Sequence, residues 1–328
     1  MMEGVRRMEI KGFTYGYQAE KGMYASEKGV LSRNALMDIG VNWVCLAFPV
    51  EQKTFASTEI LFDYRTNIPD LELISTIEHF HSRKVKVCLK PMINCADGVW
   101  RALISFPDSA MNGEDSYWKA WFESYQAYLT HYAEIAEYTG CEMFCLGCEM
   151  LSTEVKEEYW RKTISLVRNV YSGPLVYNTN HGKEDKAAWY DEIDYLGTSA
   201  YYPVADKAGA SKEEMVTVWE GIADQLEKIS ERLGKKVIFM EIGCRSALGC
   251  AQMPWDFMHQ EFPFSEEEQS NFYASSLEVM SKREWFMGYF WWDWSTHIYE
   301  TRERALTDTG FNIYYKKAEQ VLRDWYQR

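Results

Sequence analysis

The sequence lacks the long apolar runs and the excess of basic charge that mark membrane-spanning and nucleic-acid-binding proteins. No stretch of its 328 residues approaches the length of about 18 apolar residues that a membrane span needs. Its 49 Asp and Glu outnumber its 35 Lys and Arg, which leaves a net charge of −14. Because nucleic acids and anionic membrane surfaces both require a basic patch, we expect neither as a partner, whereas a neutral partner is compatible with this charge.

The N-terminal segment has no signal-peptide pattern. No apolar run of suitable length follows Arg6 and Arg7. We therefore expect a cytoplasmic protein, and a secreted one only if an N-terminal segment has been trimmed.

Motifs for several kinds of chemistry are also missing. Neither G-x-G-x-x-G nor a P-loop is present, which argues against a nucleotide-binding doubly wound sheet. There is no H-E-x-x-H and no G-x-S-x-G, and the six His are scattered. The eight Cys lie mostly in apolar runs, so we expect reduced core thiols, and the C-x-x-C of Cys145 and Cys148 has no second pair at zinc-ribbon spacing. We expect no metal and no cofactor.

Aromatic residues, in contrast, are abundant. They make up 16% of the chain and include 13 Trp and 22 Tyr. Trp and Tyr are flat and amphipathic, so this excess is compatible both with a cleft that stacks on a ligand and with an aromatic core. Composition leaves these two interpretations open.

Short apolar runs alternate with amphipathic segments along the whole chain. The predicted strands are 13–17, 41–48, 84–89, 142–149, 175–178, 195–202, 237–243 and 287–292. The predicted helices are 26–39, 69–83, 116–138, 154–171, 186–190, 211–233, 265–283 and 312–326. Pro49 is expected to end the second strand and Lys90-Pro91 the third. Eight successive βα units with no linker between them predict one (β/α)8 TIM barrel, a single catalytic domain over residues 1–328.

The active site of such a barrel lies at the C-terminal ends of its strands. The fourth predicted strand ends in Glu149 and the seventh carries Glu241. A lone strand-end Glu is commonly half of a structural ion pair, but two of them, three strands apart in the ring, can approach across the barrel mouth. Together with the amides, phenols and indoles at other strand ends, they are what glycosidic bond cleavage requires. A carboxyl separation of about 5–5.5 Å would give retention and about 6.5–9.5 Å inversion, and the sequence leaves this open.

Four segments resemble glycoside hydrolase family 113: VIFMEIGCRSALGCAQMPW (237–255), LKPMINCADGVWR (89–101), DYLGTSAYYP (194–203) and GYFWWDWS (288–295). The E-I-G-x-R-S stretch is the most specific of them. The resemblance covers essentially the whole chain. It implies a β-mannanase of the retaining (β/α)8 clan, with Glu149 matching the acid/base and Glu241 the nucleophile.

The resemblance also implies substrate contacts. Tyr201 or Tyr202 matches the tyrosine of the sixth strand near the nucleophile, and Trp292 the indole beneath the sugar. The substrate contacts expected in the third-strand loop are Lys90, Asn94, Trp100 and Arg101.

Two positions depart from the expected pattern, and one of them is Met92, where a polar residue is expected in the third-strand loop. The other lies beside the acid/base. Many members have Asn immediately before the acid/base, where it contacts the 2-hydroxyl of the sugar, and this chain has Cys148. The contact is then expected to come from Asn94 or Asn180, or to be absent.

The activity that the resemblance implies is cleavage of β-1,4-mannosidic bonds in mannan or manno-oligosaccharides by double displacement. The alternatives are the same mechanism on another β-glycan, exo-acting release of mannose or mannobiose, and a carbohydrate-binding barrel without catalysis. The presence of both Glu149 and Glu241 argues against a pure binding protein.

Overall fold

The computed structural model describes residues 8–108, 115–259 and 261–327. Eight parallel strands form a closed barrel in the order β1-β9-β8-β7-β6-β5-β4-β2, and pairing of β1 with β2 completes the ring. They are β1 (Ile10–Tyr15), β2 (Trp43–Gln52), β4 (Lys86–Cys95), β5 (Met143–Cys148), β6 (Leu175–Asn180), β7 (Tyr195–Ser199), β8 (Val237–Ile242) and β9 (Phe286–Trp294). The short β3 (Ile60–Leu61) adds antiparallel to β2. The predicted (β/α)8 barrel is confirmed.

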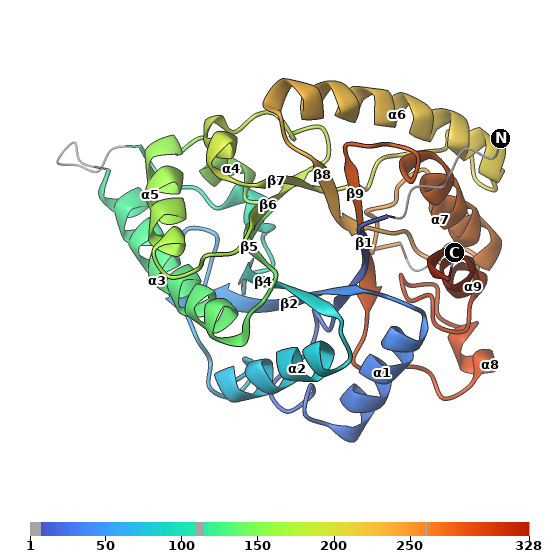
Figure 1. Cartoon of the computed structure of the whole chain (residues 1–328), viewed down its shortest axis with the longest axis horizontal. Helices are drawn as coiled ribbons and strands as arrows, with labels where there is room; N and C mark the ends of the chain where they lie inside the picture. Colours follow the sequence, from blue (N-terminus) through green and yellow to red (C-terminus); the bar gives the residue numbers. More distant parts are fainter. Residues whose placement is uncertain (1–7, 109–114, 260, 328) are drawn as a thin grey trace.

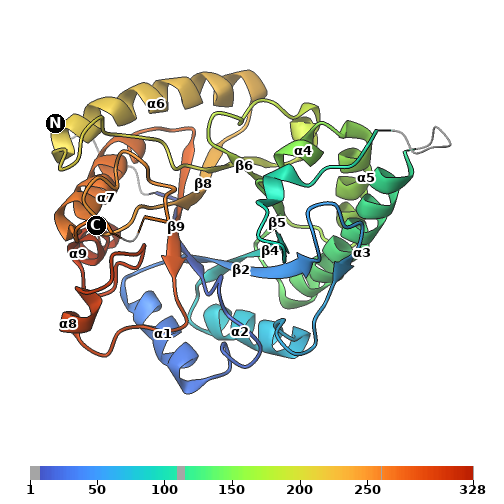
Figure 2. The ribbon, with the colours of Figure 1, turned by 180° about the vertical axis from the view of Figure 1, so that it is seen from behind.

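Helices surround the barrel on its outside (Figures 1 and 2). They are α1 (Glu27–Asp38), α2 (Asp70–Ser82), α3 (Ser116–Thr139), α4 (Leu151–Glu154), α5 (Glu157–Arg168), α6 (Lys212–Leu233), α7 (Glu266–Met280), α8 (Arg302–Ala305) and α9 (Lys317–Tyr326). Two 3₁₀ turns, η1 (Arg101–Leu103) and η2 (Ala188–Glu192), lie in connections. In the part of the chain that the structure describes, no helix is long and apolar enough to cross a membrane.

The helix ends follow the sequence signals closely. Gly140 ends α3 with φ 71°, a left-handed conformation that glycine adopts without a Cβ clash. Ser211 and Glu214 form a capping box at the start of α6. At the start of α7 only half of such a box forms, because Ser265 caps the helix while the Glu268 carboxylate accepts from other backbone amides.

The largest errors in the predicted boundaries fall at the ends of two strands and at the start of one helix. Strand β2 continues through Pro49, and β4 continues through Pro91 to Cys95. In these extensions β2 and β4 pair with each other. At Pro91 β4 has no pairing with β5, and at Pro49 β2 has no pairing with β1 and does not yet pair with β3, which joins it at Glu51 and Gln52. A proline, which has no N–H to donate, is tolerated where a strand has a ladder partner on one side only. The last helix starts at Lys317 rather than at residue 312.

The aromatic residues largely build the core. Seven of the 13 Trp are almost completely buried, among them Trp160, Trp189 and Trp219 in the layer between strands and helices. The barrel interior is filled by a separate cluster that includes Cys45, Cys88 and other sulfur-containing side chains. All eight Cys are free and buried, which confirms the prediction of reduced core thiols.

Candidate active site

Glu241 lies in β8 with its carboxylate enclosed by donors from three other strands or strand ends. Lys90 Nζ is 2.5 Å from Oε1, the Cys148 thiol donates to the same oxygen over 3.2 Å, and the Tyr201 hydroxyl donates to Oε2 over 3.1 Å. Burial opposes ionisation of this group, but the charge and hydrogen bond of Lys90 outweigh it and lower the pKa of Glu241. The side chain is therefore held as a carboxylate.

Lys90 reaches Glu241 from inside the barrel. It is a β4 residue with a completely buried side chain, and its Nζ also donates to Asn178 Oδ1 over 2.6 Å. The Asn178 amide in turn donates to Ser199 Oγ over 2.8 Å, so β6 and β7 fix its orientation. Expected in the third-strand loop, Lys90 instead lies within the strand, with its charge directed at the carboxylate.

Glu149 directly follows β5 and has φ 55°, an uncommon backbone conformation for a residue with a Cβ. Its Oε2 accepts from Arg101 over 3.2 Å and from the indole N–H of Trp100 over 3.4 Å. Burial, together with the negative charge of Glu241, raises its pKa even though Arg101 opposes this. The surroundings thus push the pKa values of the two glutamates in opposite directions, which is how one site obtains a proton donor and an anion from two carboxyl groups.

Arg101 connects Glu149 to β4 and to the segment that follows β1. It donates to Asn94 Oδ1 over 2.8 Å, to the Tyr17 hydroxyl over 3.1 Å and to the Ile93 carbonyl over 2.9 Å. The Tyr17 ring lies 4.8 Å from that of Trp292, so Asn94, Arg101 and the predicted sugar platform are brought together. Sequence reasoning missed Tyr17 as a site residue, although its place at the end of the first predicted strand was a usable signal.

The two adjacent tyrosines after β7 have different partners. Tyr201 contacts Glu241, whereas the Tyr202 hydroxyl hydrogen-bonds to Glu184, which also accepts from Thr198 over 2.8 Å. Of the predicted pair, Tyr201 is therefore the tyrosine at the carboxylate.

Asn180 closes β6 at the same end of the barrel. Among the described residues its buried Oδ1 has no hydrogen-bond partner. The structure thus leaves that oxygen unpaired beside the end of the strand that carries Asn178.

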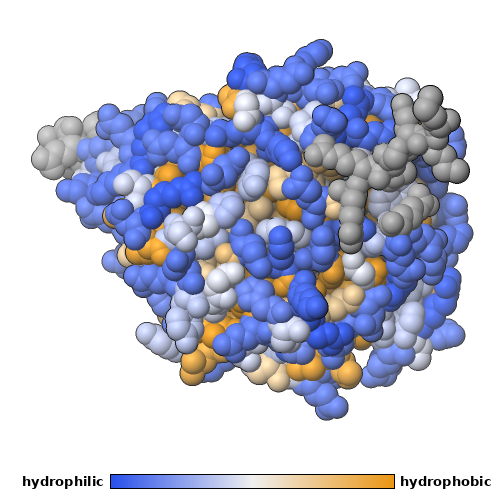
Figure 3. Space-filling view, viewed as in Figure 1, coloured by the Kyte–Doolittle hydropathy of each residue, from blue (hydrophilic) through white to orange (hydrophobic). Residues whose placement is uncertain are grey.

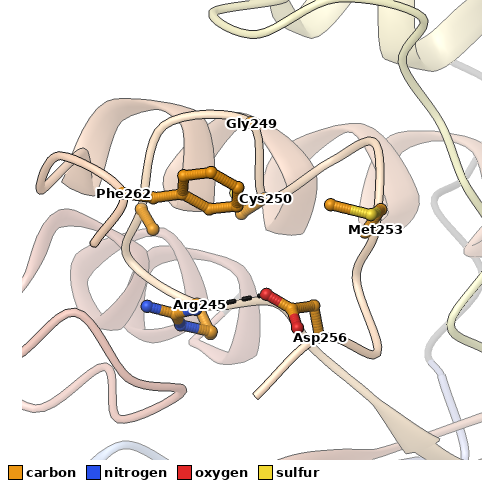
Figure 4. Close-up of a pocket in the computed structure, with 7 residues that line it drawn as sticks. Arg245, Gly249, Cys250, Met253, Asp256 and Phe262 are labelled. Atoms are coloured by element: carbon orange, nitrogen blue, oxygen red, sulfur yellow. Dashed lines mark hydrogen bonds and ion pairs between the residues drawn. The ribbon is translucent and has the colours of Figure 1, made fainter. Parts of the chain in front are cut away.

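The loop that follows β8 is held by an ion pair within it, between Arg245 and Asp256 (Figure 4), and by contacts to other segments. Arg245 is 3.3 Å from Asp256, and it also donates to the Thr309 carbonyl over 3.2 Å and to the His259 carbonyl. Glu268 of α7 accepts from the Gly249 amide over 2.7 Å in the same loop.

Hydrophilic side chains cover most of the face shown in Figure 3, with smaller hydrophobic areas between them.

Comparison with known proteins identifies relatives of this chain. The model of Glycoside Hydrolase Family 113 matches residues 13–316. A solved GH113 β-1,4-mannanase complex is 36% identical with a TM-score of 0.89, covering 98% of this chain and 99% of that one. The GH113 β-mannanase AaManA from Alicyclobacillus acidocaldarius, in complex with ManMIm, is also 36% identical, with a TM-score of 0.88 and 98% coverage of both chains.

More distant structures share the fold alone. The β-glucuronidase of Faecalibacterium prausnitzii is 15% identical with a TM-score of 0.63, and the match covers 98% of this chain and 49% of that one. A comparison with curated protein sequences gives no match. Since the family model spans most of the chain and near-full-length relatives share 36% identity, this chain belongs to glycoside hydrolase family 113.

Proposed function

We propose that this glycoside hydrolase is a retaining β-mannanase that cleaves β-1,4-mannosidic bonds in mannan or manno-oligosaccharides. The observation that carries the proposal is the opposed perturbation of two carboxyl groups at one barrel end, where the surroundings lower the pKa of Glu241 and raise the pKa of Glu149. The substrate class follows from the β-1,4-mannanases that share 36% identity with the chain.

In the first step Glu241 attacks the anomeric carbon and forms an ester with the sugar. At the same time Glu149 gives its proton to the glycosidic oxygen, so the leaving sugar departs as a neutral alcohol. In the second step Glu149, now ionised, takes a proton from water, and the resulting hydroxide equivalent displaces Glu241 from the anomeric carbon. Two inversions at one carbon give overall retention.

The neighbouring side chains have distinct proposed roles. Lys90, Cys148 and Tyr201 hold the Glu241 carboxylate in its anionic form and fix its two oxygens. Trp292, beside the Tyr17 ring, is the proposed platform for the sugar at the cleavage site. Other proposed substrate contacts are Asn94, Asn180, Trp100, Arg101 and Tyr202.

Azide rescue tests the two glutamates separately. Glu241→Ala should abolish hydrolysis, and azide should restore turnover of an activated β-mannoside with an α-mannosyl azide as product. Glu149→Ala should give a β-mannosyl azide instead, because azide then attacks an intact glycosyl-enzyme. Glu59→Ala, which removes an exposed carboxylate, is the control and should behave like the wild type. Full activity of Glu241→Ala would rule out the proposed nucleophile, and faster cleavage of cellohexaose than of mannohexaose would rule out the proposed substrate.

A further inference from the structure

The backbone at Glu149 has to be held in place by its surroundings. A φ of 55° is unfavourable for a residue with a side chain, so neighbouring contacts must select it over the ordinary conformations. Two backbone amides provide such contacts. The Glu149 N–H donates to the Asn178 carbonyl over 2.8 Å, and the Met150 N–H donates to the Tyr177 hydroxyl over 3.1 Å.

The Tyr177 hydroxyl accepts one hydrogen bond and donates another. Burial keeps it protonated by raising its pKa well above the ordinary value. Its oxygen accepts from Met150, and its single hydrogen is donated to Glu154 Oε1 over 2.8 Å. Tyr177 therefore links the residue after Glu149 to a buried carboxyl group that the hydrolytic mechanism does not use.

Glu154 ends α4, the single helical turn that starts two residues after Glu149. Two indoles cap that turn, since the Trp160 N–H donates to the Thr153 carbonyl and the Trp189 N–H to the Glu154 carbonyl, each over 2.9 Å. The Trp160 and Trp189 rings stack at 4.6 Å, and the Trp189 ring packs edge-on at 5.1 Å against Tyr177. The carboxyl group that receives the Tyr177 hydrogen is thus itself fixed by aromatic packing.

Close packing between Tyr177 and the turn leaves no room for a side chain at position 147. A Cβ on Gly147 would lie 3.0 Å from Tyr177 Cε2 and 2.6 Å from Met150 Cε. The glycine lets the tyrosine approach the strand end that carries Glu149.

We propose that Tyr177 and Glu154 are positioning residues that orient the acid/base Glu149 through the Met150 amide. The inference rests on the proposed function of Glu149, and neither residue is assigned contact with the substrate. The inference predicts a different effect on two kinds of substrate. Misplacing the acid/base should impair the cleavage of bonds whose leaving group needs a proton, and spare bonds whose leaving group does not.

The test compares two substrates through kcat/KM, which reports the first chemical step. For Tyr177→Phe we expect a fall of about 10- to 100-fold on mannohexaose, because its sugar leaving group needs protonation. On 2,4-dinitrophenyl β-mannobioside, whose leaving group departs as an anion, kcat/KM should remain close to that of the wild type. Glu154→Ala should show the same split, and Glu154→Gln, which keeps an acceptor for the tyrosine hydrogen, should restore activity on mannohexaose.

Tyr171→Phe is the matched control. Its hydroxyl is buried and donates to the Cys141 carbonyl over 2.8 Å, before the start of β5, so its loss should produce no split between the substrates. Equal losses on both substrates in Tyr177→Phe and Glu154→Ala would overturn the inference, as would full activity on mannohexaose. If Tyr177→Phe fails to fold, the two Glu154 variants decide alone. A wild type that cleaves neither substrate would instead overturn the proposed function.

Discussion

Lys90 Nζ and Glu241 Oε1 lie 2.5 Å apart, and both side chains are closed off from solvent inside the barrel. A buried cation and anion stabilise each other only as a pair, because removing one leaves the other charge without compensation. Here the pairing joins β4 to β8 and leaves the second carboxylate oxygen of Glu241 to Tyr201. The ion pair is thus both a structural link and the reason that Glu241 stays ionised.

Replacing Lys90 by Met should raise the pKa of Glu241, since the charge and hydrogen bond that lower it would be gone. Less of the group is then ionised at a given pH, so the acidic limb of the kcat/KM profile should move to higher pH. We expect activity at neutral pH to fall on the order of 100-fold. Lys86→Met removes an exposed lysine from the same strand and should leave the profile unchanged. An unshifted acidic limb in Lys90→Met would contradict this reading.

Replacing Arg101 by Met should shift the basic limb of the pH profile of kcat/KM. Arg101 opposes the burial and the Glu241 charge that raise the pKa of Glu149, so its loss should raise that pKa further. The basic limb, where Glu149 loses its proton, should move to higher pH while the acidic limb moves much less. A pH profile of kcat/KM for wild type and variant checks the direction. Movement of the basic limb to lower pH would show that Arg101 acts on Glu149 in some other way.

Replacing Cys148 by Ala removes one donor from the Glu241 carboxylate and leaves Lys90 in place. A thiol is a weak donor, so its hydrogen bond to the carboxylate should contribute about 0.5–1.5 kcal/mol, and kcat/KM should fall by about 2- to 10-fold. Cys141→Ala, a buried thiol that contacts Thr139 before β5 starts, should have no such effect on rate. If Cys148→Ala matched the wild type, the thiol contact would have no part in stabilising the anion.

The stability of the strand end that carries Glu149 can be tested with two glycines. Gly147→Ala would place a Cβ 2.6 Å from Met150 Cε and 2.7 Å from the Tyr125 hydroxyl, which should cost about 1–3 kcal/mol. Gly221→Ala on α6 meets nothing within 4 Å and should stabilise the protein by about 0.5–1 kcal/mol through helix propensity. Urea unfolding of both variants measures the difference. Similar midpoints for the two would show that the barrel adjusts around position 147.

The positions of Glu149 and Glu241 were predictable because each ends an apolar run, and a parallel barrel brings all such ends to one rim. Asn178 could be found in the same way. Lys90 was harder to place, because Pro91 suggested that the strand stopped there, whereas β4 runs on to Cys95. The local pattern did not show that the strand lacks a ladder partner on one side at that point.

Glu154 and Glu184 were beyond sequence reasoning. A carboxylate in a helical turn or loop normally faces solvent, and both of these are buried. Their partners, Tyr177 and Tyr202, lie 23 and 18 residues away and come near only once the barrel has closed. Pairings across that distance have no local periodicity that would reveal them.

Glu268 of α7 anchors two loops at the C-terminal end of the barrel. One of its carboxylate oxygens accepts from Gly209 and Gly249, and the other accepts from Ala251, so one helix ties down the loops after β7 and β8 together. Loops anchored in this way are not free to move apart from each other. Substrate should therefore enter without a preceding opening of these loops, and limited proteolysis of the native protein should spare residues 244–251.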